Sequence, residues 1–172
     1  MAALPQCHAF IACSLDGYIA RADGDIDWLT SLPVADGEDG GYGAFIGGMD
    51  AILMGRGTYE KVLGFDPWPY ALPVTVASRH LPAGPAGRVV ISGAPLREIL
   101  AGMTGRVYVD GGQIISALLR EGLMTRLTVT VAPVLLGGGL PLFQATGQVG
   151  LRLDRVRHWQ PGFVQMDYTC AR

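Results

Sequence analysis

Residues 51–64, AILMGRGTYEKVLG, join a run of apolar residues to a helix-forming segment through two glycines that flank an arginine. The apolar run at 50–54 is typical of a buried strand, and residues 55–63 favour a helix. Glycines at such a junction let another group approach the backbone closely, and the free N–H groups of a helix start attract anions. The stretch therefore predicts a strand-to-helix unit with a ligand near its junction.

The same alternation of strands and helices recurs along the chain. Apolar, β-branched runs predict further strands at 8–13, 73–77, 88–91, 106–109 and 126–132. Helices are expected over 95–102, 112–121 and, despite its many glycines, 36–48. Residues 151–159 and 163–170 alternate apolar and polar side chains around a Pro161-Gly162 turn, which predicts an antiparallel hairpin. These patterns predict an α/β protein of three layers, with a mostly parallel central sheet and an antiparallel C-terminal hairpin.

The composition favours a single globular domain over residues 1–172, because 49% of the chain is hydrophobic and only 16% is charged. A net charge of −2 gives no general attraction to nucleic acid or to an anionic membrane. No apolar run reaches the roughly 20 residues that span a bilayer, and the N-terminus does not resemble a signal peptide. We therefore expect a cytoplasmic protein with neither nucleic acid nor membrane as partner.

Cysteines and histidines do not form a recognisable metal motif in this sequence. The three cysteines lack a C-x-x-C pair, and the three histidines lack the spacing of a zinc site. No metal is expected.

Three of the predicted strands end in similar segments. Gly55-Arg56-Gly57-Thr58 follows one, Ser78-Arg79 follows the next, and Asp110-Gly111-Gly112-Gln113 opens the helix at 112–121. None of these is a Walker A or Rossmann sequence, and each alone could be an ordinary turn or a solvated arginine. In open α/β sheets, however, ligands bind beyond the carboxyl ends of the strands. Two glycine junctions and two arginines there predict a ligand with more than one phosphate.

Together these segments resemble the dihydrofolate reductase fold, and more closely the reductase domain of the bifunctional riboflavin-biosynthesis deaminase-reductase. The resemblance rests on FIACSLDGYIA (10–20), DIDWL (25–29), ILMGRGTYE (52–60), VTVASR (74–79), VYVDGGQIISALLREGL (107–123) and APVLLGGGLPLF (132–143). It implies an NADPH-dependent reductase that transfers hydride to a C=N or C=O bond of a pyrimidine- or pterin-like heterocycle. It also implies a role in riboflavin biosynthesis.

The resemblance further implies which residues would bind NADPH. Arg56, after Gly55, would meet the 2′-phosphate or the adenine, and Thr58 would lie near the pyrophosphate. Ser78 and Arg79 would line the adenosine phosphate. The pyrophosphate would be surrounded by Gly111, Gly112, Gln113 and Ile114, and the nicotinamide would be flanked by Ala12 and Ile19. A valine at Gly112 is expected to abolish dinucleotide binding while the protein stays folded.

The substrate residues have two interpretations each. Asp16 and Asp27 could orient a polar ring or relay a proton, or could be a turn residue and a helix cap. Trp28 could stack on a flat heterocycle or fill the core. No proton donor is identified, because the register of Asp36, Glu38 and Asp39 is not fixed by the pattern.

Other functions remain open from the sequence. Tyr18 stands where the riboflavin reductases often carry a basic residue for a phosphorylated substrate, and the zinc deaminase motifs are missing. The alternatives are a dihydrofolate reductase proper and a nucleotide-binding module without turnover. A homodimer is expected as well, because the apolar stretch 129–143 lies in the region through which the riboflavin-type reductases pair.

Overall fold

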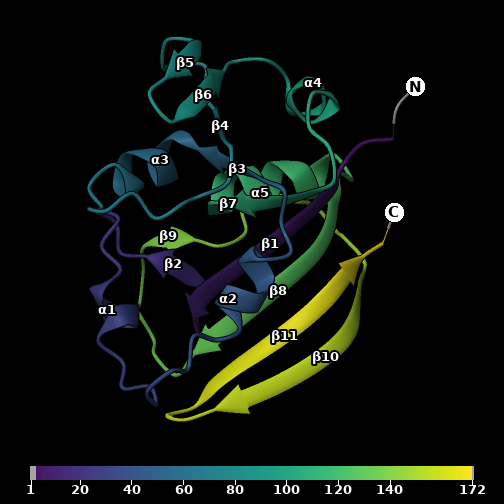
Figure 1. Ribbon diagram of the computed structural model, residues 1–172. Helices are drawn as coiled ribbons and strands as arrows, with labels where there is room; N and C mark the ends of the chain where they lie inside the picture. Colours follow the sequence, from purple (N-terminus) through teal and green to yellow (C-terminus); the bar gives the residue numbers. More distant parts are fainter. Residues whose placement is uncertain (1–2, 172) are drawn as a thin grey trace.

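The computed structural model describes residues 3–171 and is built on one nine-stranded sheet (Figure 1). The strands follow the order β10-β11-β8-β1-β7-β3-β4-β6-β5 across the sheet. Their bounds are β1 Gln6–Ser14, β3 Ala51–Gly55, β4 Val74–Ala77, β5 Gly84–Ala86, β6 Val89–Ser92, β7 Arg106–Asp110, β8 Met124–Ala132, β10 Leu151–Trp159 and β11 Phe163–Cys170. The predicted strands are thus all present.

Strand direction follows the predicted pattern. β8, β1, β7, β3, β4 and β6 pair in parallel, so their carboxyl ends lie along one edge of the sheet. β11 runs antiparallel to β8, and β10 antiparallel to β11, which confirms the C-terminal hairpin. The short β5 adds a second antiparallel strand at the opposite end of the sheet.

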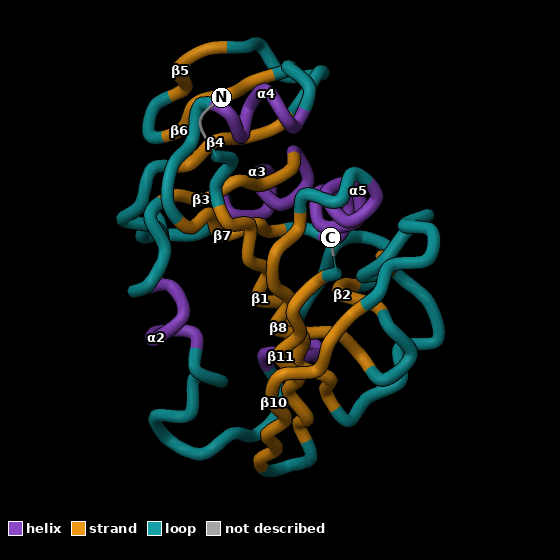
Figure 2. Tube along the Cα trace, turned by 90° about the vertical axis from the view of Figure 1, so that its right-hand side faces the viewer, coloured by secondary structure: helices purple, strands orange, loops and turns teal. Residues whose placement is uncertain are grey.

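Helices cover both faces of the sheet. On one face, α4 (Leu96–Ala101) and α5 (Gly112–Arg120) pack on a core that includes Leu53, Val109 and Leu127. On the other face, α2 (Tyr42–Ile46) and α3 (Arg56–Val62) pack on a second core with Ile52, Met54 and Val76. Figure 2 shows α2 and α5 on opposite sides of the strands. This arrangement confirms the three-layer α/β prediction.

The helix expected over 36–48 is shorter than predicted. Only Tyr42–Ile46 is helical, and Gly41 before it has a φ of 83°, outside the helical region. The Asp39 carboxylate accepts the N–H groups of Gly41 at 2.7 Å and Gly43 at 2.8 Å, which sets where the helix begins. The preceding residues form turns because glycine has low helix propensity.

Three further short elements lie close to the carboxyl edge of the sheet. β2 (Tyr18–Ala20) pairs with β9 (Leu140–Pro141), and α1 (Asp27–Thr30) follows β2. The backbone of Leu142 also donates to the carbonyl oxygen of Gly17 at 2.9 Å. These contacts bring the chain around residue 141 against the start of α5.

Gly112, the first residue of α5, is a packing position. A Cβ built there would lie 2.9 Å from the carbonyl oxygens of both Pro141 and Leu142, and 3.2 Å from Ile19 Cδ1. A valine at Gly112 would press further atoms against backbone of the same chain, so we expect it to destabilise the fold as well as to affect dinucleotide binding.

We predict that Gly112→Ala lowers the free energy of unfolding by about 1–3 kcal/mol, the usual cost of forcing extra atoms into a filled site. Urea unfolding followed by circular dichroism measures this change. Gly57→Ala is the matched control, because no atom lies within 4 Å of its built Cβ and alanine favours a helix. Equal midpoints for both variants would contradict the close packing at Gly112.

Candidate functional site

A cleft of about 650 Å³ opens at the carboxyl edge of the sheet, between the ends of β1 and β7, the segment after β2, and α3. This volume falls within the range of small-molecule sites. Most of its wall is apolar, and four of the residues predicted to bind the cofactor line it: Ala12, Ile19, Thr58 and Gly111.

The two glycine junctions predicted from the sequence lie side by side. β3 and β7 are neighbours, with Met54 opposite Asp110. A Cβ on Gly111, whose φ is 104°, would lie 2.5 Å from Thr58 Oγ1, and a Cβ on Gly55 would lie 3.0 Å from Ile114 Cγ1. Glycine is therefore required at Gly111 both by conformation and by space. The first turn of α5 consequently starts directly beside the Thr58 hydroxyl.

The remaining predicted cofactor residues lie outside the wall of the cleft. Ser78 and Arg79 follow β4 and lie against Gly93 after β6, since a Cβ on Gly93 would be 3.3 Å from the Ser78 carbonyl oxygen. The Ser78 hydroxyl accepts the N–H groups of His80 and Leu81, both at 3.1 Å, and so holds the turn. Arg79 and Gln113 are exposed.

Arg56 begins α3 immediately before two residues of the cleft wall. Its side chain is 52% exposed and contacts only Glu60 among the described residues, at 3.9 Å from Nε to Oε1. Because a contact of this length between exposed groups contributes little, the guanidinium can turn to an anionic ligand.

Asp110 is the functional candidate that the sequence interpretation missed. It ends β7 and lines the cleft, where it is half-buried, and desolvation raises the pKa of its carboxyl above the usual range. The hydroxyls of Tyr108 and Tyr70 offset part of this shift, and Tyr70 donates to Asp110 Oδ2 at 3.4 Å. A carboxyl with a raised pKa in a cleft can hold a proton for transfer.

Asp110 could have been noticed as the acidic residue between a buried strand and two glycines. Its burial and its tyrosine neighbour Tyr70, which comes from 40 positions away, are visible only in three dimensions. The other acids considered do not line the cleft: Asp39 caps α2, and Glu38 binds the Gly40 N–H at 2.7 Å and lies beside Arg157.

Asp16 has the turn role that the sequence left open. Its carboxylate accepts the Ser14 hydroxyl at 2.6 Å and the N–H groups of Leu136 at 3.0 Å and Gly137 at 2.7 Å. The Ser14 hydrogen bond, followed by that of Leu136, lowers the pKa of this exposed carboxyl to about 2. Asp16 therefore ties the loop after β8 to the end of β1 and is held in the charged form.

Asp27 and Trp28 also lie outside the cleft wall. Asp27 is exposed at the start of α1. Trp28 is only 6% exposed and packs in a small core with Ala132 and Phe163. This packing favours the core interpretation of Trp28, because little of its side chain is open to a ligand.

Residues 3–171 contain neither a metal cluster nor a membrane-spanning helix. No group of three or more His, Cys, Asp or Glu side chains in that range could hold a metal ion. No helix in the same part of the chain is long and apolar enough to cross a membrane.

Comparison with known proteins gives related sequences and folds. YwjB of Bacillus subtilis, an uncharacterized protein, is 31% identical over 94% of this chain and 96% of its own length. The riboflavin biosynthesis protein RibD of Mycobacterium tuberculosis is 33% identical over 91% of this chain, which corresponds to 50% of RibD. The chain thus matches about half the length of that relative.

Solved structures give the same result. A putative riboflavin biosynthesis protein from Shewanella has a TM-score of 0.88 and 35% identity, over 97% of this chain and 99% of the other. The deaminase/5-amino-6-(5-phosphoribosylamino)uracil reductase of Thermotoga maritima shares the fold, with a TM-score of 0.72 and 15% identity over 98% of this chain and 57% of that one. The family model of the RibD C-terminal domain matches residues 5–165. The chain therefore belongs to the RibD C-terminal domain family.

Proposed function

We propose that this protein is a reductase that uses NADPH to reduce a C=N or C=O bond of a flat pyrimidine- or pterin-like heterocycle. The observation that carries the proposal is the cleft itself, which combines an apolar wall, a close pair of glycine junctions and the half-buried carboxyl of Asp110. Membership of the RibD C-terminal domain family supports a reductase-like role.

The residues around the cleft fit a dinucleotide. Ala12 and Ile19 offer small apolar contacts for a flat nicotinamide ring. The first amides of α5 have no acceptor within their own helix, so they can bind a pyrophosphate that approaches along Gly111. Gly57 leaves open space, since no atom lies within 4 Å of its built Cβ. Arg56 and Arg79 are exposed cations at the same edge and can bind a 2′-phosphate.

NADPH supplies the hydride in this proposal, and the protein positions the substrate, excludes water and delivers a proton. Asp110 is the proton donor, because burial favours its protonated form and its carboxyl faces the cleft beside Tyr70. This acid lies at a strand end, whereas the folate enzymes place theirs on the helix after the substrate loop. That difference favours a pyrimidine over a folate substrate.

The substrate panel therefore includes 5-amino-6-ribosylaminouracil with and without its 5′-phosphate, dihydrofolate and simple pterins. Steady-state NADPH oxidation separates the candidate functions. Turnover of a uracil substrate supports the proposal, turnover of dihydrofolate alone favours a dihydrofolate reductase, and NADPH binding without turnover of any heterocycle favours a silent nucleotide-binding module.

The preference for NADPH over NADH tests the role of Arg56. We predict that Arg56→Ala weakens NADPH binding by roughly 1.5–3 kcal/mol, the range for hydrogen bonds to charged groups. NADH lacks the 2′-phosphate and serves as the internal control, so its affinity should barely change. Isothermal titration calorimetry measures both affinities. Equal losses for the two cofactors would refute the assignment of Arg56 to the 2′-phosphate.

The proton-donor role of Asp110 is tested by pH dependence. The acid works only when protonated, so kcat should be highest below the raised pKa of Asp110 and fall as pH rises through it. Asp110→Asn should lower kcat by about 10²–10⁴ and abolish that limb of the profile. Asp23→Asn is the control, because Asp23 also lines the cleft but is exposed. An unchanged pH profile in Asp110→Asn would exclude Asp110 as the donor.

We further propose that the protein acts as a homodimer that pairs through the C-terminal hairpin. Residues 129–132 belong to a central strand, so that part of the expected interface is interior. β10, in contrast, is an edge strand, and one of its faces exposes three large apolar side chains: Leu151, Leu153 and Val156. Their partners on β11 are Cys170, Tyr168 and Met166. Leu135 and Phe143 are also exposed. A second copy would bury this surface.

Light scattering should accordingly return twice the 18.2 kDa mass of the chain at micromolar concentration. The double variant Leu153→Glu with Val156→Glu should give a monomer, because it places charges on the apolar face of β10. Arg152→Gln, on the opposite face of the same strand, should remain a dimer. A wild-type mass of one chain would rule out this assembly.

A further inference from the structure

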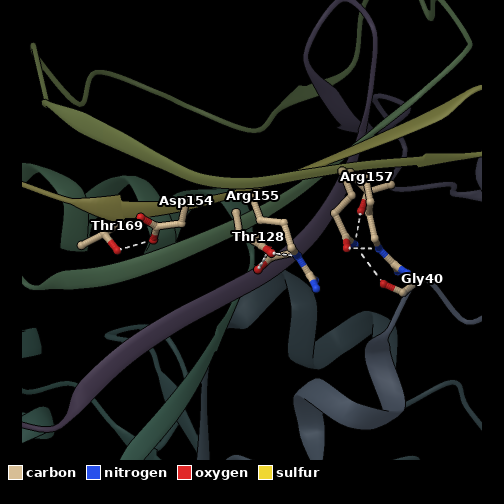
Figure 3. Close-up of polar contacts among 9 residues, drawn as sticks. Gly40, Thr128, Asp154, Arg155, Arg157 and Thr169 are labelled. Atoms are coloured by element: carbon tan, nitrogen blue, oxygen red, sulfur yellow. Dashed lines mark hydrogen bonds and ion pairs between the residues drawn. The ribbon is translucent and has the colours of Figure 1, made fainter.

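A second cavity, of about 550 Å³, lies between α2 and the face of the sheet formed by β1, β8, β11 and β10. Four arginines from three different strands line it: Arg106, Arg126, Arg155 and Arg157. Its two carboxylates, Asp154 and Asp167, come from the C-terminal hairpin. Figure 3 shows the polar contacts along this face.

Both carboxylates are already neutralised by neighbours on the sheet. Asp167 accepts the Thr128 hydroxyl at 2.7 Å and Arg155 Nε at 2.9 Å. Asp154 accepts the Thr169 hydroxyl at 2.6 Å and Nε of Arg152, which is not part of the cavity wall, at 2.9 Å. Each carboxylate therefore binds one hydroxyl and one arginine Nε on a neighbouring position of the sheet, and the other N–H groups of the cavity arginines are not taken up by these acids.

Arg157 is held in place but keeps donors available. Its Nε donates to Gln165 Oε1 at 2.7 Å, and its guanidinium lies 4.6 Å from the centroid of the Trp159 ring. Gln165 is fixed in turn by donating to the Gly40 carbonyl oxygen at 2.9 Å and to Thr130 Oγ1 at 2.8 Å. This network presents a rigid guanidinium edge toward the cavity.

Buried nitrogen atoms without partners gather around the same cavity. Among residues 3–171, three buried side-chain nitrogen or oxygen atoms have no hydrogen-bond partner, and two of them, Arg157 Nη2 and His8 Nε2, belong to residues of this cavity wall. Arg157 Nη2 forms an ion pair with Glu38 Oε1 at 3.8 Å, a separation longer than a hydrogen bond. A buried polar atom without a hydrogen bond lowers the stability of the protein, so a ligand that supplies the missing hydrogen bond binds favourably.

The electrostatic surroundings favour an anion here. Burial lowers the pKa of His8, and the charges of Arg126 and Arg106 lower it further. Within residues 3–171, the Arg126 side chain has neither a hydrogen bond nor an ion pair. The Arg106 side chain donates to the Gly48 carbonyl oxygen at 3.3 Å, and the Arg106 backbone N–H donates to Asp50 Oδ2 at 2.7 Å. The wall thus carries four arginines against two carboxylates, and Glu38, paired with Arg157 at 3.8 Å, is a third acid beside it.

An aromatic wall separates this cavity from the cleft. Phe10 is the one residue that lines both, and it packs on Phe45 at 4.8 Å and on Tyr42 at 5.7 Å between ring centroids. Both aromatic partners come from α2. A ligand of the arginine cavity would therefore contact neither Asp110 nor the glycine junctions.

We propose that this cavity is a second binding site, which takes the phosphate group of a small phosphorylated molecule. Arg126 and Arg155 bind the phosphate oxygens beside His8 Nε2, whereas Arg157, four positions from His8 along the strand register, binds another polar group of the same molecule through Nη2. Planar guanidinium groups suit this role, because each can make two parallel hydrogen bonds to a phosphate. The site is independent of the reductase proposal.

Histidine NMR signals can locate the bound anion, with inorganic phosphate as the probe at constant ionic strength. The ring signal of His8 should shift and saturate, because His8 lines the cavity. The chemical shift of His158 should not change, since His158 is exposed and does not line this cavity. His80 follows Arg79 at the carboxyl edge and reports phosphate bound there instead. A shift of His80 with His8 unmoved would overturn the proposal.

Variants complete the test. Arg126→Gln combined with Arg155→Gln should weaken phosphate binding by about tenfold or more, as measured from the His8 titration. Arg97→Gln, which removes one charge from α4 on the opposite face of the sheet, should leave the phosphate affinity unchanged. Ribose 5-phosphate should compete with phosphate, whereas chloride at equal ionic strength should not. Affinity unaffected by the double variant, or an effect of chloride equal to that of phosphate, would refute the site.

Discussion

The site depends on the close contact between two neighbouring strand ends. β3 and β7 pair in parallel, and both turn into helices at the same edge of the sheet. A side chain at Gly111 would collide with the Thr58 hydroxyl, and one at Gly55 would crowd Ile114. Without glycine at these positions the two helices could not start so close together, and the cleft beside them would have a different shape.

Burial at this edge also sets the chemistry. Partial burial of the carboxyl that ends β7 raises its pKa, which is the property that an acid needs. Asp16, one turn beyond β1, is exposed and bound to three donors, so its pKa moves in the opposite direction. Two carboxyls near the same sheet edge thus differ in environment: Asp16 holds a loop in its charged form, and Asp110 has the raised pKa that the proposed proton donor requires.

The sequence predicted the parts of the fold that local pattern determines. Buried strands such as β3 and β7 are continuous apolar runs, and α5 has a clear apolar face ending at Gly122. The short elements β2, β9 and α1 were not predicted, because pairing between residues as distant as Tyr18 and Pro141 forms them. Ala12, Ile19, Thr58 and Gly111 were found in the cleft through the family resemblance.

Residues whose role depends on tertiary neighbours were harder to interpret. Gly112 looks like a phosphate-binding glycine in the sequence, yet the backbone of Pro141 and Leu142 occupies the space above it. The arginine cavity could not be predicted at all, because its cations come from β7, β8 and β10, and only the sheet order brings them together. Asp110 was passed over for the same reason.

A crystal structure of the protein grown with NADPH would test the central claim most directly. We expect the nicotinamide ring between Ala12 and Ile19, the pyrophosphate along Gly111 and the first turn of α5, and the 2′-phosphate within reach of Arg56. Density for the dinucleotide in another part of the molecule, or a cleft that stays empty at saturating NADPH, would contradict it.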